Sequence, residues 1–127
     1  MKTRLLNLFF LFALLTPCNA RDDIRQMSAS EFRDAVAGDS SAALLDVRSA
    51  KEYAGGHLAS AMNIDILQEE AFVSKAKSLD KSKTWYIYCR SGRRSMRAAC
   101  LMKDLGYSVV NMEGGITAWE KAKFPVT

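Results

Sequence analysis

The segment Thr84–Ser95, TWYIYCRSGRRS, decides the fold of this 127-residue chain. Its first five residues are aromatic or β-branched, which is typical of a buried β-strand. A short loop with one glycine follows, and beyond it Ala98, Leu101, Met102 and Leu105 recur at the spacing of one helix face. The segment therefore predicts a strand, a tight loop and a helix in direct succession.

The same alternation of strand and helix patterns continues on both sides of this segment. Short apolar or β-branched runs predict further strands at Ile24–Met27, Ala42–Val47, Ala61–Ile64 and Ser108–Met112. Helical patterns follow a capping box at Ser28 and Glu31, and recur at Ser49–Tyr53, Ile66–Leu79 and Ile116–Lys121. The alternation is typical of an α/β fold, in which a mainly parallel sheet of about five strands has helices on both faces.

Cys89 ends the predicted strand and opens the loop, at the edge of a parallel sheet where ligands bind. Gly92 allows a positive φ, so the loop can curl with its N–H groups turned inward as an anion-binding nest. The N-terminus of the next helix and three neighbouring arginines add positive charge. Because these features favour a thiolate over a thiol, we interpret Cys89 as a nucleophile beside an oxyanion site. The residues of that site are Arg90, Ser91, Gly92, Arg93, Arg94 and Ser95.

A cysteine at a strand end is also compatible with a simpler role as a small buried hydrophobe. The arginines argue against that role here, because cations are unfavourable at a helix N-terminus unless an anion binds there. Cys100 has no flanking charge and is interpreted as core packing. Since the whole loop separates Cys100 from Cys89, we expect no disulfide between them.

The first twenty residues predict a signal peptide rather than a part of the fold. Lys2 and Arg4 form a positive n-region, an apolar run follows at Leu5–Leu15, and Cys18-Asn19-Ala20 offers a cleavage site. One alternative is a membrane anchor, but the apolar run is shorter than the ~20 residues that a spanning helix needs. Another is a lipoprotein anchored through Cys18. We expect residues 1–20 to be removed, and residues 21–127 to form one domain in the periplasm.

Removal of this segment also changes the charge of the working protein. Residues 1–20 hold two cations and no acid, so their loss lowers the net charge from +4 to +2. The composition then predicts neither nucleic-acid binding nor attachment to a membrane surface.

Three segments, in chain order, resemble the signatures of the rhodanese family. They are Asp46-Val47-Arg48 with Glu52-Tyr53 and Gly56–Ile64, the loop Cys89–Arg94, and Asn111–Trp119. The resemblance covers nearly all of residues 24–124. With a signal peptide before one domain, the chain is similar to the periplasmic single-domain rhodaneses, which implies the rhodanese-like α/β fold.

The resemblance also implies a ping-pong sulfur transfer. Cys89 would take the sulfane sulfur of thiosulfate as a persulfide, release sulfite, and pass the sulfur to cyanide or a thiol. The loop N–H groups and Arg93 or Arg94 would hold the anionic donor. No metal or organic cofactor is implied, and we expect a monomer. The residues that would give structural support are Asp46, Arg48 and His57.

Two observations narrow the reaction. Glu52 stands where some two-domain rhodaneses have a donor-binding arginine, which favours a persulfide donor other than thiosulfate. The six residues Cys89–Arg94 favour sulfur transfer over a Cdc25-like phosphatase, whose loop is one residue longer. That phosphatase and a non-catalytic rhodanese binding module are the alternatives. A thiol-redox role lacks the expected Cys-x-x-Cys pair.

Overall fold

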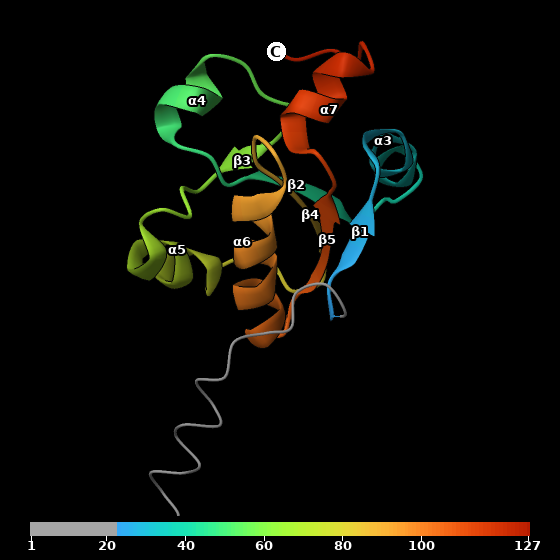
Figure 1. The fold of residues 1–127 in the computed structure, drawn as a ribbon. Coiled ribbons are helices and arrows are strands. Elements are labelled where there is room, and N and C mark those ends of the chain that lie inside the picture. The colour runs from blue at the N-terminus through green and yellow to red at the C-terminus, as the bar shows by residue number, and fades with distance from the viewer. Residues whose placement is uncertain (1–22) are drawn as a thin grey trace, which may run out of the picture.

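One parallel β-sheet forms the centre of the protein (Figure 1). The computed structural model describes residues 23–127, and within them the strand order is β1-β5-β4-β2-β3, with every neighbouring pair parallel. The strands are β1 (Arg25–Met27), β2 (Ala42–Asp46), β3 (Met62–Asn63), β4 (Thr84–Tyr88) and β5 (Ser108–Met112). The predicted α/β class is therefore confirmed. The signal peptide predicted for residues 1–20 lies outside the described residues.

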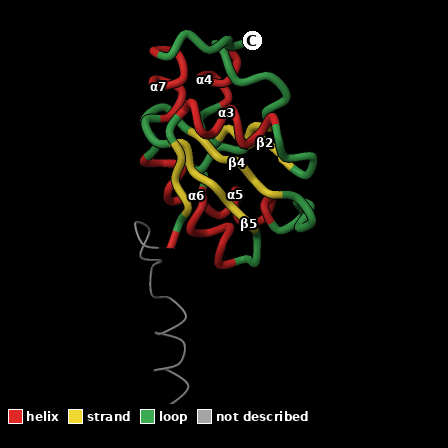
Figure 2. Tube along the Cα trace, turned by 90° about the vertical axis from the view of Figure 1, so that its right-hand side faces the viewer, coloured by secondary structure: helices red, strands yellow, loops and turns green. Residues whose placement is uncertain are grey.

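Helices cover both faces of the sheet. They are α3 (Ala29–Ala37), α4 (Ala50–Ala54), α5 (Glu69–Ala76), α6 (Arg93–Asp104) and α7 (Gly115–Lys121). Figure 2 shows β2, β4 and β5 between two layers, with α5 and α6 on one side and α3 and α7 on the other. None of the helices in residues 23–127 combines the length and apolar character needed to cross a membrane.

β4 is the central strand, and its side chains alternate between the two cores. Trp85 and Ile87 pack in the core that α5 and α6 cover, whereas Tyr86 and Tyr88 pack in the core that α3 and α7 cover. All four are at most 4% exposed. β4 pairs with β2 on one side and with β5 on the other. Cys89 directly follows β4, so its position is fixed by a strand that has neighbours on both edges and a core on both faces.

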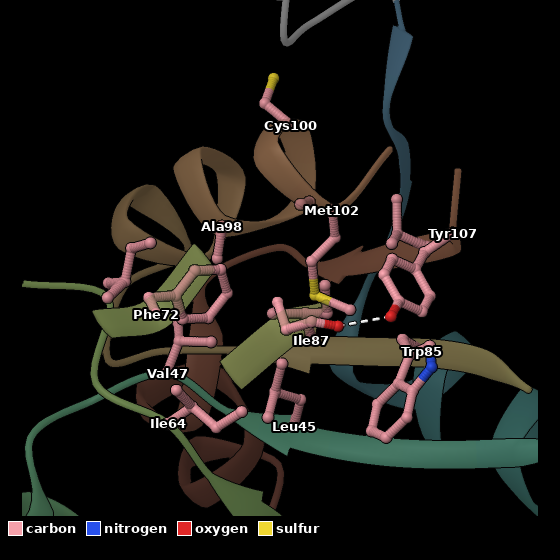
Figure 3. Close-up of a cluster of buried hydrophobic side chains, with 14 of the residues drawn as sticks. Leu45, Val47, Ile64, Phe72, Trp85, Ile87, Ala98, Cys100, Met102 and Tyr107 are labelled. Carbon is pink, nitrogen blue, oxygen red and sulfur yellow. Dashed lines mark hydrogen bonds between the residues drawn. The ribbon is translucent and has the colours of Figure 1, made fainter. Parts of the chain in front are cut away.

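The core under α5 and α6 joins elements that are distant in the sequence. Figure 3 shows Leu45 and Ile87, from neighbouring strands, packed beneath Met102 of α6. The Tyr107 hydroxyl donates to the Ala76 carbonyl, which ties the end of α5 to the segment before β5. Full burial of a side chain such as Met102 contributes about 1.5–3 kcal/mol. This core holds α6, and with it the end of the β4–α6 loop, against the sheet.

One predicted helix is shorter in the structure. The pattern predicts a helix over Ile66–Leu79, whereas α5 covers only Glu69–Ala76. Ile66 instead donates its backbone N–H to the Val47 carbonyl and buries its side chain, so it extends the edge of the sheet. Apolar spacing alone does not separate such a residue from the first turn of a helix. The predicted capping box at Ser28 is present.

Candidate active site

The Cys89 sulfur is buried at the carboxyl end of β4, beneath the loop that leads to α6. Sγ accepts a hydrogen bond from the Gly92 N–H at 3.1 Å and another from the Ser95 hydroxyl at 3.3 Å. Cys89 carries a free thiol, and Cys100 lies in the buried cluster on the α6 side of the sheet. Two donors directed at one sulfur stabilise negative charge on it, because hydrogen bonds to charged acceptors are the stronger ones.

Gly92 shapes the turn that directs its own N–H to the sulfur. It is the N-cap of α6 and has a φ of +98°, as the sequence predicts. A Cβ at this position would lie 3.2 Å from the Met112 carbonyl oxygen and 3.3 Å from the Gly114 nitrogen. Its carbonyl accepts a hydrogen bond from Asn111 Nδ2 at 3.3 Å. Strand β5 therefore holds the turn closely, and only glycine fits it without displacement.

The N-terminus of α7 supports the loop from the other side. The start of α7 lies at the same end of the sheet as the β4–α6 loop (Figure 1). The Ile116 N–H donates to the Cys89 carbonyl at 2.9 Å, and the Thr117 N–H donates to the Arg90 carbonyl at 3.2 Å. A Cβ on Gly115 would lie 2.4 Å from the Cys89 carbonyl oxygen. The sequence prediction missed this support, and the Gly114-Gly115 pair is the only signal that could have indicated it.

Arg94 is bound to Glu52, so one of the three arginines expected to add positive charge beside Cys89 is paired with a carboxylate. Its Nη1 and Nη2 donate to the two carboxylate oxygens of Glu52 at 2.7 and 2.8 Å. The hydrogen bond from Arg94 lowers the pKa of Glu52 to about 2, and the same bond raises the pKa of Arg94. Both groups therefore stay ionised at neutral pH, and the charge of Arg94 is compensated.

Arg90 and Arg93 keep exposed side chains and line two different hollows beside the loop. The Arg90 hollow has a volume of about 570 Å³, and its other lining residues are Arg48, Glu52, Ile116, Thr117, Glu120 and Lys121. The Arg93 hollow has a volume of about 600 Å³, and its other lining residues are Gln26, Ser91, Gly92, Met96, Asn111, Glu113 and Gly114. Both hollows are open and have charged side chains in their lining, which suits small charged reactants that approach the loop.

Asp46 and Arg48 form a buried ion pair at the end of β2. Arg48 donates from Nε and Nη2 to the Asp46 carboxylate at 3.0 and 2.6 Å, and its backbone N–H donates to the same carboxylate at 2.9 Å. Arg48 Nη2 also donates to the Gly56 carbonyl at 2.7 Å. The pair thus fixes the turn after α4 beside the Arg90 hollow, and its carboxylate is fully occupied.

His57 contacts its own neighbourhood and the end of the chain. Its ring stacks on the Tyr53 ring with centroids 3.7 Å apart, and Nδ1 is 2.9 Å from the Tyr53 carbonyl oxygen. Its backbone exchanges two hydrogen bonds with Thr127, at 3.1 and 2.8 Å. These contacts join the last residue to the turn before β3. Each of these contacts involves Tyr53 or Thr127, and none of them involves the Cys89 sulfur.

The chemistry that the arrangement supports is covalent transfer through sulfur. A nucleophile at a strand end, two donors on its sulfur and a helix N-terminus together stabilise a sulfur anion before and after transfer. Among residues 23–127, no group of three or more His, Cys, Asp or Glu side chains is placed to hold a metal ion.

Comparisons with known proteins agree with this geometry. The sequence model of the rhodanese-like domain family matches residues 28–122, a range that contains Cys89 and the loop that follows it. The Bacillus subtilis protein YtwF is 34% identical over 98 residues, which cover 77% of this chain and 92% of YtwF. The thiosulfate sulfurtransferase PspE of Escherichia coli is 32% identical over 72 residues, which cover 57% of this chain and 68% of PspE.

A solved structure shows the same arrangement of elements. The crystal structure of a rhodanese-related protein from Thermoplasma volcanium matches with a TM-score of 0.72 and 30% sequence identity. The match covers 81% of this chain and 97% of that protein.

Proposed function

The chain belongs to the rhodanese-like domain family, and from this membership we propose that it is a sulfurtransferase that carries sulfane sulfur as a persulfide on Cys89. One observation carries the proposal: the free Cys89 thiol accepts hydrogen bonds from Gly92 and Ser95 at the start of α6. A sulfur held in this way is suited to act as both nucleophile and leaving group.

In the first half-reaction, the Cys89 thiolate attacks the sulfane sulfur of the donor. A new S–S bond forms to Cys89 while the S–S bond of thiosulfate breaks, and sulfite leaves with the electron pair of that bond. The similarity to PspE, a thiosulfate sulfurtransferase, supports thiosulfate as a donor. A persulfide of a thiol is the related alternative, and its parent thiolate would leave in the same way.

In the second half-reaction, cyanide or a thiolate attacks the outer sulfur of the Cys89 persulfide. The bond between the two sulfurs breaks, and Cys89 leaves as a thiolate that the Gly92 N–H and the Ser95 hydroxyl stabilise. Donor and acceptor exchange one sulfur atom without a net oxidant or reductant. The pattern of residues 1–20 supports a periplasmic location for this reaction, and we propose that a monomer carries it out.

Intact-mass spectrometry of the purified protein after thiosulfate treatment tests the proposal. The protein should become heavier by the mass of one sulfur atom, and cyanide should restore the original mass with release of thiocyanate. Cys89→Ser should show neither change. A wild-type protein that acquires no sulfur from thiosulfate or from a thiol persulfide, or that hydrolyses phosphate esters faster than it transfers sulfur, would overturn the proposal.

A further inference from the structure

We infer that Glu52 determines the donor class of Cys89. By holding the Arg94 guanidinium, it disfavours small divalent oxyanions such as thiosulfate and directs the site to persulfides of organic thiols. This inference rests on the sulfur transfer proposed above and specifies its substrate.

The geometry of the pair shows what Arg94 has lost as a binding group. A guanidinium recognises a carboxylate or a sulfur oxyanion through two parallel N–H bonds in one plane. Both terminal nitrogens of Arg94 already make such bonds, at 2.7 and 2.8 Å, to Glu52. An oxyanion could receive this pair of bonds only by displacing the carboxylate.

Arg94 lies next to the residue that contacts the sulfur. It directly precedes Ser95, whose hydroxyl donates to Cys89 Sγ. The hydrogen bond to Glu52 is the main influence that raises the pKa of Arg94, and an electrostatic interaction with Cys89 acts in the same direction. The guanidinium is therefore within electrostatic reach of the sulfur, and Glu52 compensates its charge at that position.

Glu52 is held from its other side and cannot easily swing away. Its Oε1 accepts the Ser49 backbone N–H and the Ser49 hydroxyl, both at 3.2 Å, in the capping box that begins α4. With a pKa of about 2, the carboxylate keeps its negative charge throughout the neutral range. It also lines the Arg90 hollow, where this charge repels a dianion more strongly than a group with one negative charge.

The chain offers a matched control on the same helix. Arg97, almost one turn after Arg94, binds Glu69 through Nη2 at 2.6 Å, and both side chains are about half exposed. This second pair has the same chemistry but joins α6 to α5, and neither residue lines the two hollows. A substitution of Glu69 therefore shows how the loss of an arginine–glutamate pair on α6 affects KM and kcat when Arg94 stays bound to Glu52.

The test measures KM and kcat for two donors, thiosulfate and mercaptoethanol persulfide, in wild type, Glu52→Gln and Glu69→Gln. Glutamine keeps the capping box of α4, since it occupies that position as well as glutamate does. Its amide nitrogen would face Arg94, so the bidentate pair is lost. We expect the KM for thiosulfate to fall about tenfold in Glu52→Gln, because thiosulfate gains one charge-assisted contact with the freed Arg94 guanidinium. The KM for the persulfide should stay nearly constant, and Glu69→Gln should match wild type.

A double variant separates this role from a purely structural one. In Glu52→Gln with Arg94→Gln, the gain in thiosulfate affinity should disappear, because it depends on a free guanidinium. Glu52→Ala, which adds no new polar group, should also lower the KM for thiosulfate. It replaces Glu52→Gln in the test if the glutamine variant fails to fold. An unchanged KM for thiosulfate in both Glu52 variants would overturn the inference. Absence of sulfur on wild-type Cys89 with either donor would instead overturn the proposed function.

Discussion

Two arginine–carboxylate pairs each contribute one residue to the lining of the Arg90 hollow, and the two pairs differ in their exposure to water. The side chains of Asp46 and Arg48 are 0% and 7% exposed, whereas those of Glu52 and Arg94 are 31% and 26% exposed. A buried pair is costly to break, because the remaining charge is left without a partner in a medium of low polarity. A pair in contact with water contributes little to stability. The first pair therefore serves the fold, and the second is available to control the reaction.

The two pairs also differ in what else they hold. Arg48 joins β2 to the turn after α4 through the Gly56 carbonyl, so its loss would disturb the frame of the hollow. Arg94 joins α6 to α4 only through Glu52, and its neighbour Ser95 contacts the sulfur directly. Variants of the first pair should thus change the free energy of unfolding, and variants around the second should change the reaction.

The largest effect on stability is expected from Asp46→Asn. The variant keeps the size of the side chain but leaves the Arg48 guanidinium buried without a counter-charge. We expect the free energy of unfolding to fall by about 3–5 kcal/mol, measured by urea titration. Asp34→Asn is the matched control, because it breaks the exposed pair with Arg33 and should cost at most about 1 kcal/mol. Equal losses in the two variants would contradict the distinction between buried and exposed pairs.

The next effect should appear in the rate of sulfur transfer and not in stability. Ser95→Ala removes one of the two hydrogen bonds to Cys89 Sγ. Loss of a hydrogen bond to a charged group changes a rate or equilibrium constant by about ten- to a hundredfold. We therefore expect kcat/KM for sulfur transfer to fall by that factor. Stopped-flow measurement of sulfite release checks it. Ser108→Ala, at the exposed start of β5, should leave the rate unchanged, and an unchanged rate in Ser95→Ala would refute the role of the hydroxyl.

Features that depend on neighbours in the sequence could be predicted. The bounds of β4 and β5 are as predicted. The β4 sequence consists of aromatic and β-branched residues, which strongly favour a strand. Gly92 adopts the positive φ that a tight turn before a helix requires. Asp46 and Arg48 are only two residues apart, so their pairing at a strand end follows from local geometry.

Features that depend on the folded chain could not be predicted. Glu52 and Arg94 are 42 residues apart in the sequence. In its local context, Glu52 is only the N3 residue of a capping box, and Arg94 is only a residue in the first turn of a helix. The hydrogen bonds from Ile116 to Cys89, and from Asn111 to Gly92, likewise join separate elements. Such contacts appear only when the sheet order brings β5 and α7 beside β4.

The smallest effect is the pH dependence that the Glu52–Arg94 pair adds to stability. The hydrogen bond from Arg94 lowers the pKa of Glu52 from 4.5 to about 2. A group with a lowered folded-state pKa stabilises the protein above its unfolded pKa, and this stabilisation is lost as the pH falls from about 4.5 towards 2. Because the carboxylate is nearly one-third exposed, we expect it to contribute at most about 1 kcal/mol after solvent screening.

Urea unfolding of wild type and Glu52→Gln between pH 7 and pH 2.5 measures this contribution. Wild type should be the more stable at pH 7, and the difference should shrink below pH 4.5, the ordinary pKa of the carboxyl group. In an Arg94→Gln background the main cause of the lowered pKa is absent, so the difference between Glu52 and its glutamine variant should depend less on pH. A difference that grows as the pH falls would show that Glu52 is held in its protonated form, and that Arg94 is free for the donor.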